Sequence, residues 1–324
     1  MATYKDIHGT NIEVVSSDPS NPVEGQVWYN SSSGALKGAS VTTAGAWSSG
    51  GNLNTGRSHF QGGGGSSSDA ALACGGLPAT AKTEAYNGAS WTEVADLNTA
   101  RYVTSSGTYT SVLTTGGNGS LANTELWNGT NWTEVNDLNQ GRFQLASAGA
   151  DSTSALAFGG YTPPITHIAL SETWNGTNWS EGNDMNLARY VLSGAGVATS
   201  ALAYGGDGSP PGYDAQTEAY NGTNWTEVND LNTARFGIGS TNGSSNTSAL
   251  ASGGEAPGTG VTAVVEEWNG TNWTEVADLS VPRYAIGGAG TTSSAIAFGG
   301  SPTGTSTEEW NGAGSAQTRT FTDS

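Results

Sequence analysis

Residues 127–142 read WNGTNWTEVNDLNQGR. Close copies of this phrase stand at 174–189, 220–235 and 268–283, and a more altered copy stands at 86–101. Repetition of this kind is typical of architectures in which each unit buries its apolar face against its neighbours. The phrase therefore predicts how the chain is built, and its sameness indicates a scaffold and not a binding site.

Three markers recur in phase along the chain. A Trp is followed ten residues later by an Arg, and an apolar run that ends in Gly-Gly comes next. The Trp residues are Trp47, Trp91, Trp132, Trp179, Trp225 and Trp273, the Arg residues are Arg57, Arg101, Arg142, Arg189, Arg235 and Arg283, and the Gly-Gly pairs stand at 75–76, 116–117, 159–160, 205–206, 253–254 and 299–300. Successive Trp residues are 41 to 48 residues apart, which is the range of β-propeller blades. Six sets of markers predict six units.

Each unit divides into four short strands. The stretch after the Arg, such as RYAIGGAG at 283–290, is rich in small residues and suits a crowded innermost strand. A run such as SALAFGG predicts a buried second strand, and a run such as TELWNG ends at an Asn-Gly turn. NWTEV alternates as a fourth strand, and the polar turn NDLN leads to the next Arg. Strand–turn–strand repeated in this way predicts antiparallel blades.

The two ends of the array complete each other. The last unit has its aromatic residue at Trp310 but lacks the Trp expected five residues later, while Trp47 has Arg57 in register but no unit before it. We therefore expect residues 44–50 to supply the outer strand of the last unit, which closes the ring and removes its exposed edges. The tail QTRTFTD also alternates and is the competing candidate for this strand.

The predicted fold is all-β, with a six-bladed β-propeller at 44–316, an N-terminal arm at 1–43 and a C-terminal tail at 317–324. In the arm, VWYN and ALKG flank SSSG and predict a hairpin.

The order of Gly-Gly, aromatic residue, Trp and Arg resembles the kelch repeat family of β-propellers over roughly residues 44–311, although the spacing from aromatic residue to Trp is shorter than in the common kelch pattern. The segment SSDPSNPVEGQVWYNSSSGALKG at 16–38 and the Asn-Gly-Thr-Asn-Trp style of the repeats resemble stretches of tail and other virion-associated proteins of marine bacteriophages. This resemblance implies a phage structural protein whose arm docks on other virion proteins while the propeller faces outward.

Composition excludes several classes of partner. The formal net charge is −18 with ten Lys and Arg, so nucleic acid and anionic lipid surfaces are repelled. The start MATYKDIHGTNIEVV has no apolar run of signal-peptide length, so we expect no secretion through a signal peptide and no membrane insertion. The phage resemblance implies that the protein is assembled into virions in the host cytoplasm. Cys74 stands where other units have Phe158, Tyr204 or Phe298, which predicts a core residue and no disulfide.

Catalytic and metal sites need residues that break the repeat, and few do. The histidines at 8, 59 and 167 have no metal-ligand spacing, so we expect no metal, no cofactor and no copper-oxidase activity of the kelch type. Most carboxylates occupy repeated positions, with Glu at 84, 125, 172, 218, 266 and 308 and Asp at 96, 137, 184, 230 and 278. A glycosidase needs an asymmetric pair of acids, so we expect no catalytic residues.

The repeated polar residues have structural interpretations. The Asp is expected to cap its turn by bonding the backbone two residues on. The Arg is expected to bond turn carbonyls or to pair with the repeated Glu; the alternative is a ring of Arg residues that binds an anion at the axis. Asn-x-Ser/Thr triplets are expected to be turn chemistry and not glycosylation sites.

The units differ in the length of the connection that follows each Gly-Gly pair. Three consecutive units have long connections, YTPPITHIALSE, DGSPPGYDAQTE and EAPGTGVTAVVEE, which are expected on the same face as the constant DLN turn. The candidate ligand-binding residues on them are Tyr161, His167, Asp207, Tyr213, Asp214 and Glu255. Such loops suit a sugar, because aromatic rings stand beside acids and backbone amides; the alternative is ordinary variation in loop length after duplication.

The leading hypothesis is a non-enzymatic phage virion protein, structural or adhesive, that contacts a host-surface glycan or receptor. The alternatives are a glycan-active enzyme on the same loops and a kelch-type adaptor that binds a protein partner.

Overall fold

The computed structural model describes residues 12–19, 25–41, 44–60, 63–164, 166–208, 212–241, 246–312 and 316–320. These residues form strands, turns and loops, and no helix occurs among them, which confirms the all-β expectation. The chain divides into two compact units, Ala46–Asn311 and a smaller unit that joins Met1–Gly45 with Gly312–Ser324.

The larger unit contains six four-stranded antiparallel sheets. The first sheet contains β5 (Gly64–Ser67), β6 (Ala70–Cys74), β7 (Thr83–Tyr86) and β8 (Trp91–Glu93), and the second contains β9 (Thr104–Thr108), β10 (Ser111–Thr115), β11 (Thr124–Trp127) and β12 (Trp132–Val135). The third contains β13 (Ala146–Asp151), β14 (Ser154–Phe158), β17 (Ser171–Trp174) and β18 (Trp179–Glu181), and the fourth contains β20 (Ser193–Val197), β21 (Ser200–Tyr204), β23 (Thr217–Tyr220) and β24 (Trp225–Val228).

The last two sheets differ in how they are assembled. The fifth contains β25 (Gly239–Ser240), β26 (Ala249–Ser252), β29 (Val265–Trp268) and β30 (Trp273–Glu275), and the sixth contains β31 (Gly287–Gly290), β32 (Ser294–Phe298), β33 (Thr307–Asn311) and β4 (Ala46–Ser49). The expected pairing of the segment near Trp47 with the strand that ends the array is therefore present, with Trp47 opposite Trp310.

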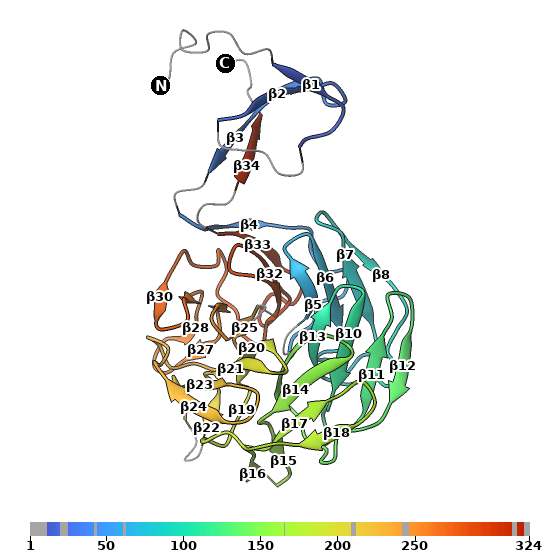
Figure 1. Ribbon diagram of the computed structural model, residues 1–324, viewed down its shortest axis with the longest axis vertical. Coiled ribbons are helices and arrows are strands. Elements are labelled where there is room, and N and C mark those ends of the chain that lie inside the picture. Colours follow the sequence, from blue (N-terminus) through green and yellow to red (C-terminus); the bar gives the residue numbers. More distant parts are fainter. Residues whose placement is uncertain are drawn as a thin grey trace. The chain divides into compact units, whose positions relative to one another are not determined.

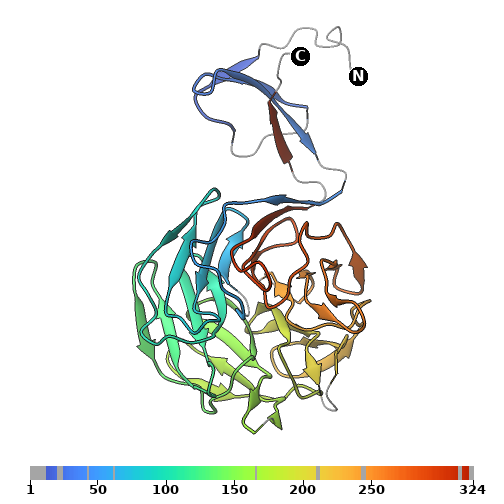
Figure 2. The same cartoon turned by 180° about the vertical axis from the view of Figure 1, so that it is seen from behind.

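The sheets lie side by side around a common centre (Figure 1, Figure 2). Their first strands are neighbours in chain order, and β31 of the sixth sheet lies beside β5 of the first. Crowding at this centre explains the small residues after each Arg. A Cβ on Gly288, for example, would lie 2.3 Å from the Ser240 carbonyl of the neighbouring sheet.

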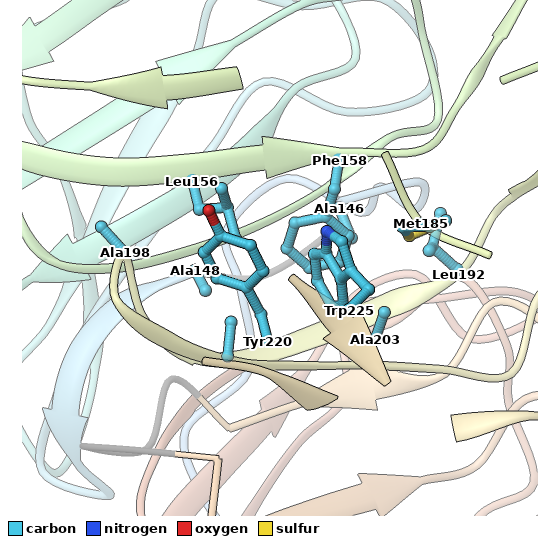
Figure 3. Packing of buried hydrophobic residues seen from close by; sticks show 11 residues of the cluster. Ala146, Ala148, Leu156, Phe158, Met185, Leu192, Ala198, Ala203, Tyr220 and Trp225 are labelled. Carbon is cyan, nitrogen blue, oxygen red and sulfur yellow. The ribbon is translucent and has the colours of Figure 1, made fainter. Parts of the chain in front are cut away.

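Aromatic side chains fill the space between sheets. In the hairpin of the third and fourth strands an aromatic residue always stands opposite the repeated Trp, as with Tyr220 and Trp225. Trp225 then packs on Phe158 of the preceding sheet, with ring centroids 4.9 Å apart (Figure 3). Loss of such a ring from a core typically costs about 3–5 kcal/mol, which explains why the turn keeps its length in the five sheets whose third and fourth strands form a hairpin.

Each repeated Arg is buried beneath its own sheet. Arg142, for example, is fully buried and forms an ion pair with Glu172 of β17 at 2.6 Å. The same pairing joins Arg57 with Glu84, Arg101 with Glu125, Arg189 with Glu218, Arg235 with Glu266 and Arg283 with Glu308. Removing one partner of such a pair leaves a buried charge uncompensated and costs about 3–5 kcal/mol. The pairs therefore hold each inter-sheet turn to the sheet that follows it.

The smaller unit is a four-stranded sheet in the order β1 (Glu13–Val15), β2 (Val27–Asn30), β3 (Ala35–Val41) and β34 (Ala316–Thr320). The predicted hairpin of VWYN and ALKG is β2 with β3. The C-terminal segment differs from the expectation of a separate tail at 317–324, because β34 pairs with β3. It is also not the outer strand of the sixth sheet, since β4 occupies that edge. The larger unit consequently ends at Asn311 and not at residue 316.

Candidate ligand-binding rim

The connections that carry the predicted site residues are joined to the inter-sheet turns by backbone pairing. The residue after an Arg pairs with the residue after a Gly-Gly pair: Phe143 with Tyr161, Tyr190 with Asp207, Phe236 with Glu255, Tyr284 with Ser301, and Ser58 with Leu77. Both kinds of loop therefore lie on one face of the larger unit, as expected. On this face three short ladders extend the long connections: β15 (Tyr161–Thr162) with β16 (Thr166–His167), β19 (Arg189–Tyr190) with β22 (Asp207–Gly208), and β27 (Glu255–Ala256) with β28 (Gly260–Val261).

The first group of rings on this face centres on Tyr190. Tyr161 lies 4.9 Å from Tyr190 between ring centroids and contacts Phe143 at 3.9 Å. His167 stacks on Tyr190 at 4.9 Å, because pairing of β15 with β16 places it opposite Tyr161. The Tyr190 hydroxyl donates a hydrogen bond to Asp207 Oδ2 at 3.1 Å. Tyr161, His167 and Asp207, which are separate in sequence, are thus brought together.

A second group of rings centres on Tyr213. Its ring stacks on Phe236 with centroids 5.2 Å apart, and Phe236 meets Tyr284 edge-on at 6.3 Å. The Tyr213 hydroxyl donates a hydrogen bond to Glu255 Oε1 at 3.1 Å. We call the two groups together the aromatic rim: Phe143, Tyr161, His167, Tyr190, Asp207, Tyr213, Phe236, Glu255 and Tyr284.

Asp207 joins the two groups. Its Oδ1 accepts a hydrogen bond from the Gly212 amide at 2.9 Å, and its backbone bridges to Tyr213. One carboxylate therefore orients the phenol of the first group and the loop that carries the second. All members of the aromatic rim are partly exposed, so each presents part of its side chain to solvent.

The two phenols that donate to carboxylates, Tyr190 and Tyr213, stay protonated at neutral pH. Burial, followed by the charge and hydrogen bond of Asp207, raises the pKa of Tyr190 to about 12. The hydrogen bond to Glu255 raises the pKa of Tyr213. Each phenol therefore acts as a donor toward a carboxylate, and each of these carboxylates has lone pairs beyond the one that its phenol uses.

Asp214 differs from the other candidate acids. Its Oδ2 is buried without a hydrogen-bond partner and lies against Gly208, where a Cβ would come within 2.3 Å of it. Burial raises the pKa of Asp214, Arg189 opposes the shift, and Asp207 adds to it. The side chain therefore packs beneath the rim and does not join the two groups of rings.

A small cavity lies at the centre of the same face. It is lined by the second residue after each Arg, which are His59, Val103, Gln144, Val191, Gly237 and Ala285, among others. All of these except Val103 have a left-handed backbone, and amide–carbonyl hydrogen bonds link Gln144 to Val191, Gly237, Ala285 and His59 in turn. The volume is about 20 Å³, which accommodates a water molecule but not a sugar. The aromatic rim is therefore the better ligand site.

Sequence reasoning missed Phe143, Tyr190, Phe236 and Tyr284. The signal was present, because each directly follows a repeated Arg, as does Tyr102 of the second sheet. In the repeat, these positions look like part of the scaffold, as the Arg itself does. The backbone of the turn, however, places the Arg beneath the sheet and the next residue on the open face.

The structure corrects two interpretations of repeated polar residues. The alternative of an anion-binding Arg ring is wrong, because every guanidinium is buried and paired with a Glu. The repeated Asp does not bond the backbone two residues on. Each Asp accepts a hydrogen bond from the amide that starts the third strand, thirteen residues earlier, as with Asp230 and the Thr217 amide at 3.1 Å. Asp96, Asp137, Asp184 and Asp278 repeat this bond.

Among the described residues, the remaining His and Cys side chains are not part of the ring–carboxylate pairs of the rim. Within the described ranges, no three His, Cys, Asp or Glu side chains gather in a geometry that could hold a metal ion. His59 packs between Tyr102 and Tyr284, and His8 is outside the described residues. Cys74 is buried in the core, and burial raises the pKa of its thiol to about 11.

No protein-family model matches this sequence, and a search of curated proteins finds no match. In the part of the chain that the structure describes, no helix has the length and apolar character that a membrane span requires.

Proposed function

We propose that this chain is a non-enzymatic β-propeller protein that binds carbohydrate through the aromatic rim. The observation that carries the proposal is the pairing of partly exposed aromatic rings with oriented carboxylates in Tyr190–Asp207 and Tyr213–Glu255. Ring faces stack on the C–H faces of sugars, while carboxylates accept hydrogen bonds from sugar hydroxyls. Both elements stand on loops anchored to a rigid sheet scaffold, which is where binding sites concentrate.

The scaffold of this function is a closed, six-bladed, kelch-like propeller in which each sheet is one blade. Three contacts between the sixth and first sheets support closure. The Gly300 amide donates to the Arg57 carbonyl at 3.0 Å, Trp91 Nε1 donates to Thr307 Oγ1 at 3.0 Å, and β31 lies beside β5. The same amide and indole bonds connect other neighbouring sheets, so the sixth-to-first contact repeats the geometry of the rest.

The protein belongs to a phage particle, with the propeller displayed and the smaller unit docked on other virion proteins. The resemblance of residues 16–38 to virion-associated proteins supports this placement. So does the distribution of apolar surface: the large apolar side chains exposed among the described residues, Ile12, Val14 and Tyr29, all belong to the smaller unit. Val14 stands opposite Tyr29 in the sheet, so the two share one face.

Two experiments test the proposal. Binding of the purified protein to arrayed glycans should fall at least about tenfold in Tyr190→Ala and in Tyr213→Ala. Tyr109→Ala, in the turn between β9 and β10 on the opposite face, is the matched control and should bind normally. Mass spectrometry of purified phage particles should find the chain, and its absence from them would contradict the virion assignment.

A glycan-active enzyme is the second candidate, because Asp207 and Asp214 are neighbouring acids and the pKa of Asp214 is raised. Unequal acids of this kind are what glycoside hydrolysis uses. Release of reducing ends from a host polysaccharide, abolished by Asp207→Asn or Asp214→Asn, would favour the enzyme. Specific capture of a protein partner that is lost in Tyr213→Ala would favour the adaptor.

A further inference from the structure

We infer that the aromatic rim selects neutral or amine-bearing saccharides and rejects acidic ones such as uronates and sialylated or sulfated sugars. This selectivity rests on the proposed carbohydrate binding, because it names the class of ligand that the same site takes.

The Lys and Arg residues of the larger unit all have acidic partners. Residues 46–311 contain seven of them, the six repeated Arg and Lys82. The six Arg side chains are buried and ion-paired with Glu residues of the sheets. Lys82 pairs with Glu93 of β8 at 2.9 Å, away from the long connections. The carboxylate of a uronate or a sulfate group would therefore meet no Lys or Arg side chain that lacks an acidic partner.

The rim presents two negatively charged carboxylates to a ligand, Asp207 and Glu255. Asp207 is bound by the Tyr190 hydroxyl and the Gly212 amide, and Glu255 by the Tyr213 hydroxyl. These partners are neutral, so they orient the carboxylates without cancelling their charge. A sugar hydroxyl or ammonium group can donate to the remaining lone pairs, whereas an anionic group is repelled.

The expected difference in affinity between neutral and acidic sugars is modest. Charges a few ångströms apart at a surface interact weakly because water and salt screen them. Two carboxylates near one anionic sugar weaken its binding by roughly tenfold at low salt, and the difference shrinks as the ionic strength rises.

The test is an array of neutral, amine-bearing and acidic glycans probed with the full chain at 20 mM and 500 mM NaCl. Ligands bound at low salt should be neutral or amine-bearing. The best neutral ligand is then compared with its uronate counterpart, which should bind about tenfold more weakly. Asp207→Asn combined with Glu255→Gln should reduce this gap, while Glu134→Gln on the outer strand β12 should leave it unchanged.

The outcomes separate the selectivity from the proposed function. Equal or tighter binding of the acidic glycans overturns the selectivity but leaves carbohydrate binding intact. The selectivity of the rim is also overturned if Glu134→Gln reduces the difference in affinity between the neutral and uronate ligands while the rim variants do not. The difference would then arise from the net charge of the whole surface. Failure to bind any glycan overturns both.

Discussion

At the scale of single residues, the repeated Glu is the point where neighbouring sheets are tied together. Glu84 accepts hydrogen bonds from the Asn54 amide, the Asn54 side chain and the Thr55 amide, in addition to Arg57. All these donors belong to the turn that leads from one sheet to the next. A buried carboxylate with several donors is well satisfied, which lets an ion pair sit beneath each sheet.

One natural difference between units removes a second repeated hydrogen bond, the one made by the indole of the repeated Trp. The indole of the repeated Trp donates to a hydroxyl at the start of the third strand of the preceding sheet, as from Trp273 to Thr217 Oγ1 at 3.0 Å. Trp91, Trp132, Trp179 and Trp225 do the same. The equivalent partner of Trp47 is Val265, and Trp47 Nε1 is buried with no hydrogen-bond partner in the described structure.

Val265→Thr should therefore stabilise the protein. The new hydroxyl supplies the missing acceptor, and a hydrogen bond of this kind contributes about 1 kcal/mol to the free energy of unfolding. Thr217→Val is the reciprocal variant, and it should cost about 1–3 kcal/mol because the Trp273 indole loses its acceptor. Urea denaturation measures both. Destabilisation by Val265→Thr would contradict the assigned geometry.

The Gly-Gly pairs are required by backbone conformation and by close packing. Gly253 has φ +62°, and a Cβ there would lie 2.5 Å from the Arg283 carbonyl of the next unit. Gly258 has φ +77° with no atom near its Cβ position.

Gly253→Ala should lower the free energy of unfolding by about 3 kcal/mol or more, since left-handed strain and overpacking act together. Gly258→Ala should cost about 1–2 kcal/mol from strain alone. Chemical denaturation of the two variants checks the difference, and equal losses would show that packing at Gly253 is not tight.

At the scale of elements, Asp18 ties the loop that follows β1 to strands β2 and β3 of the smaller unit. This carboxylate accepts hydrogen bonds from Lys37 Nζ at 2.6 Å, Asn30 Nδ2 at 2.7 Å and Trp28 Nε1 at 3.0 Å. The bond from Lys37, followed by those from Asn30 and Trp28, lowers the pKa of Asp18 from its ordinary 3.8 to about 2. Trp28 is fully buried beside it.

Acid should loosen this loop within a defined range. Because the folded pKa lies below the unfolded one, the stabilisation is complete above about pH 4 and is lost as the pH falls through 2. The Trp28 indole N–H signal and its hydrogen exchange should change over that range. Asp18→Asn should speed that exchange at neutral pH and abolish its acid transition, whereas a transition that persists in this variant would assign it to another group.

At the scale of the whole molecule, the proposed closure of the ring depends on the pairing of β4 with β33. Strand β4, at the start of the array, pairs with β33 at its end, and Ser48 lies opposite Glu309. Ala219 and Thr226 are the equivalent partners in the fourth sheet, where both strands come from one hairpin.

A disulfide between Ser48→Cys and Glu309→Cys should stabilise the oxidised protein by about 5 kcal/mol over its reduced form, because it closes a loop of nearly the whole larger unit. The matched pair Ala219→Cys and Thr226→Cys closes a short loop and should contribute about 2–3 kcal/mol. Denaturation of oxidised and reduced forms measures both values. Failure of the first pair to form would contradict closure through β4.

The sequence by itself determined the repeat, the strand order within each unit and the partner of the Trp47 strand. These follow from fixed spacings, because a slip of one residue would turn each buried ring to solvent. It also located the long connections and their face. The pairing of β34 with β3 was not predictable, since an alternating strand does not specify its partner.

Only the tertiary structure decided which side chains of the long connections meet. Spacing within one loop could not reveal that Asp207 joins Tyr190 to Tyr213, because Tyr190 belongs to an inter-sheet turn and meets the connection of Asp207 and Tyr213 only through backbone pairing. The same holds for Phe143, Phe236 and Tyr284, which look like scaffold in the repeat. Their exposure depends on the turn after each Arg, which buries one side chain and turns the next outward. Periodicity determines the repeated core, whereas the site depends on contacts between units that differ.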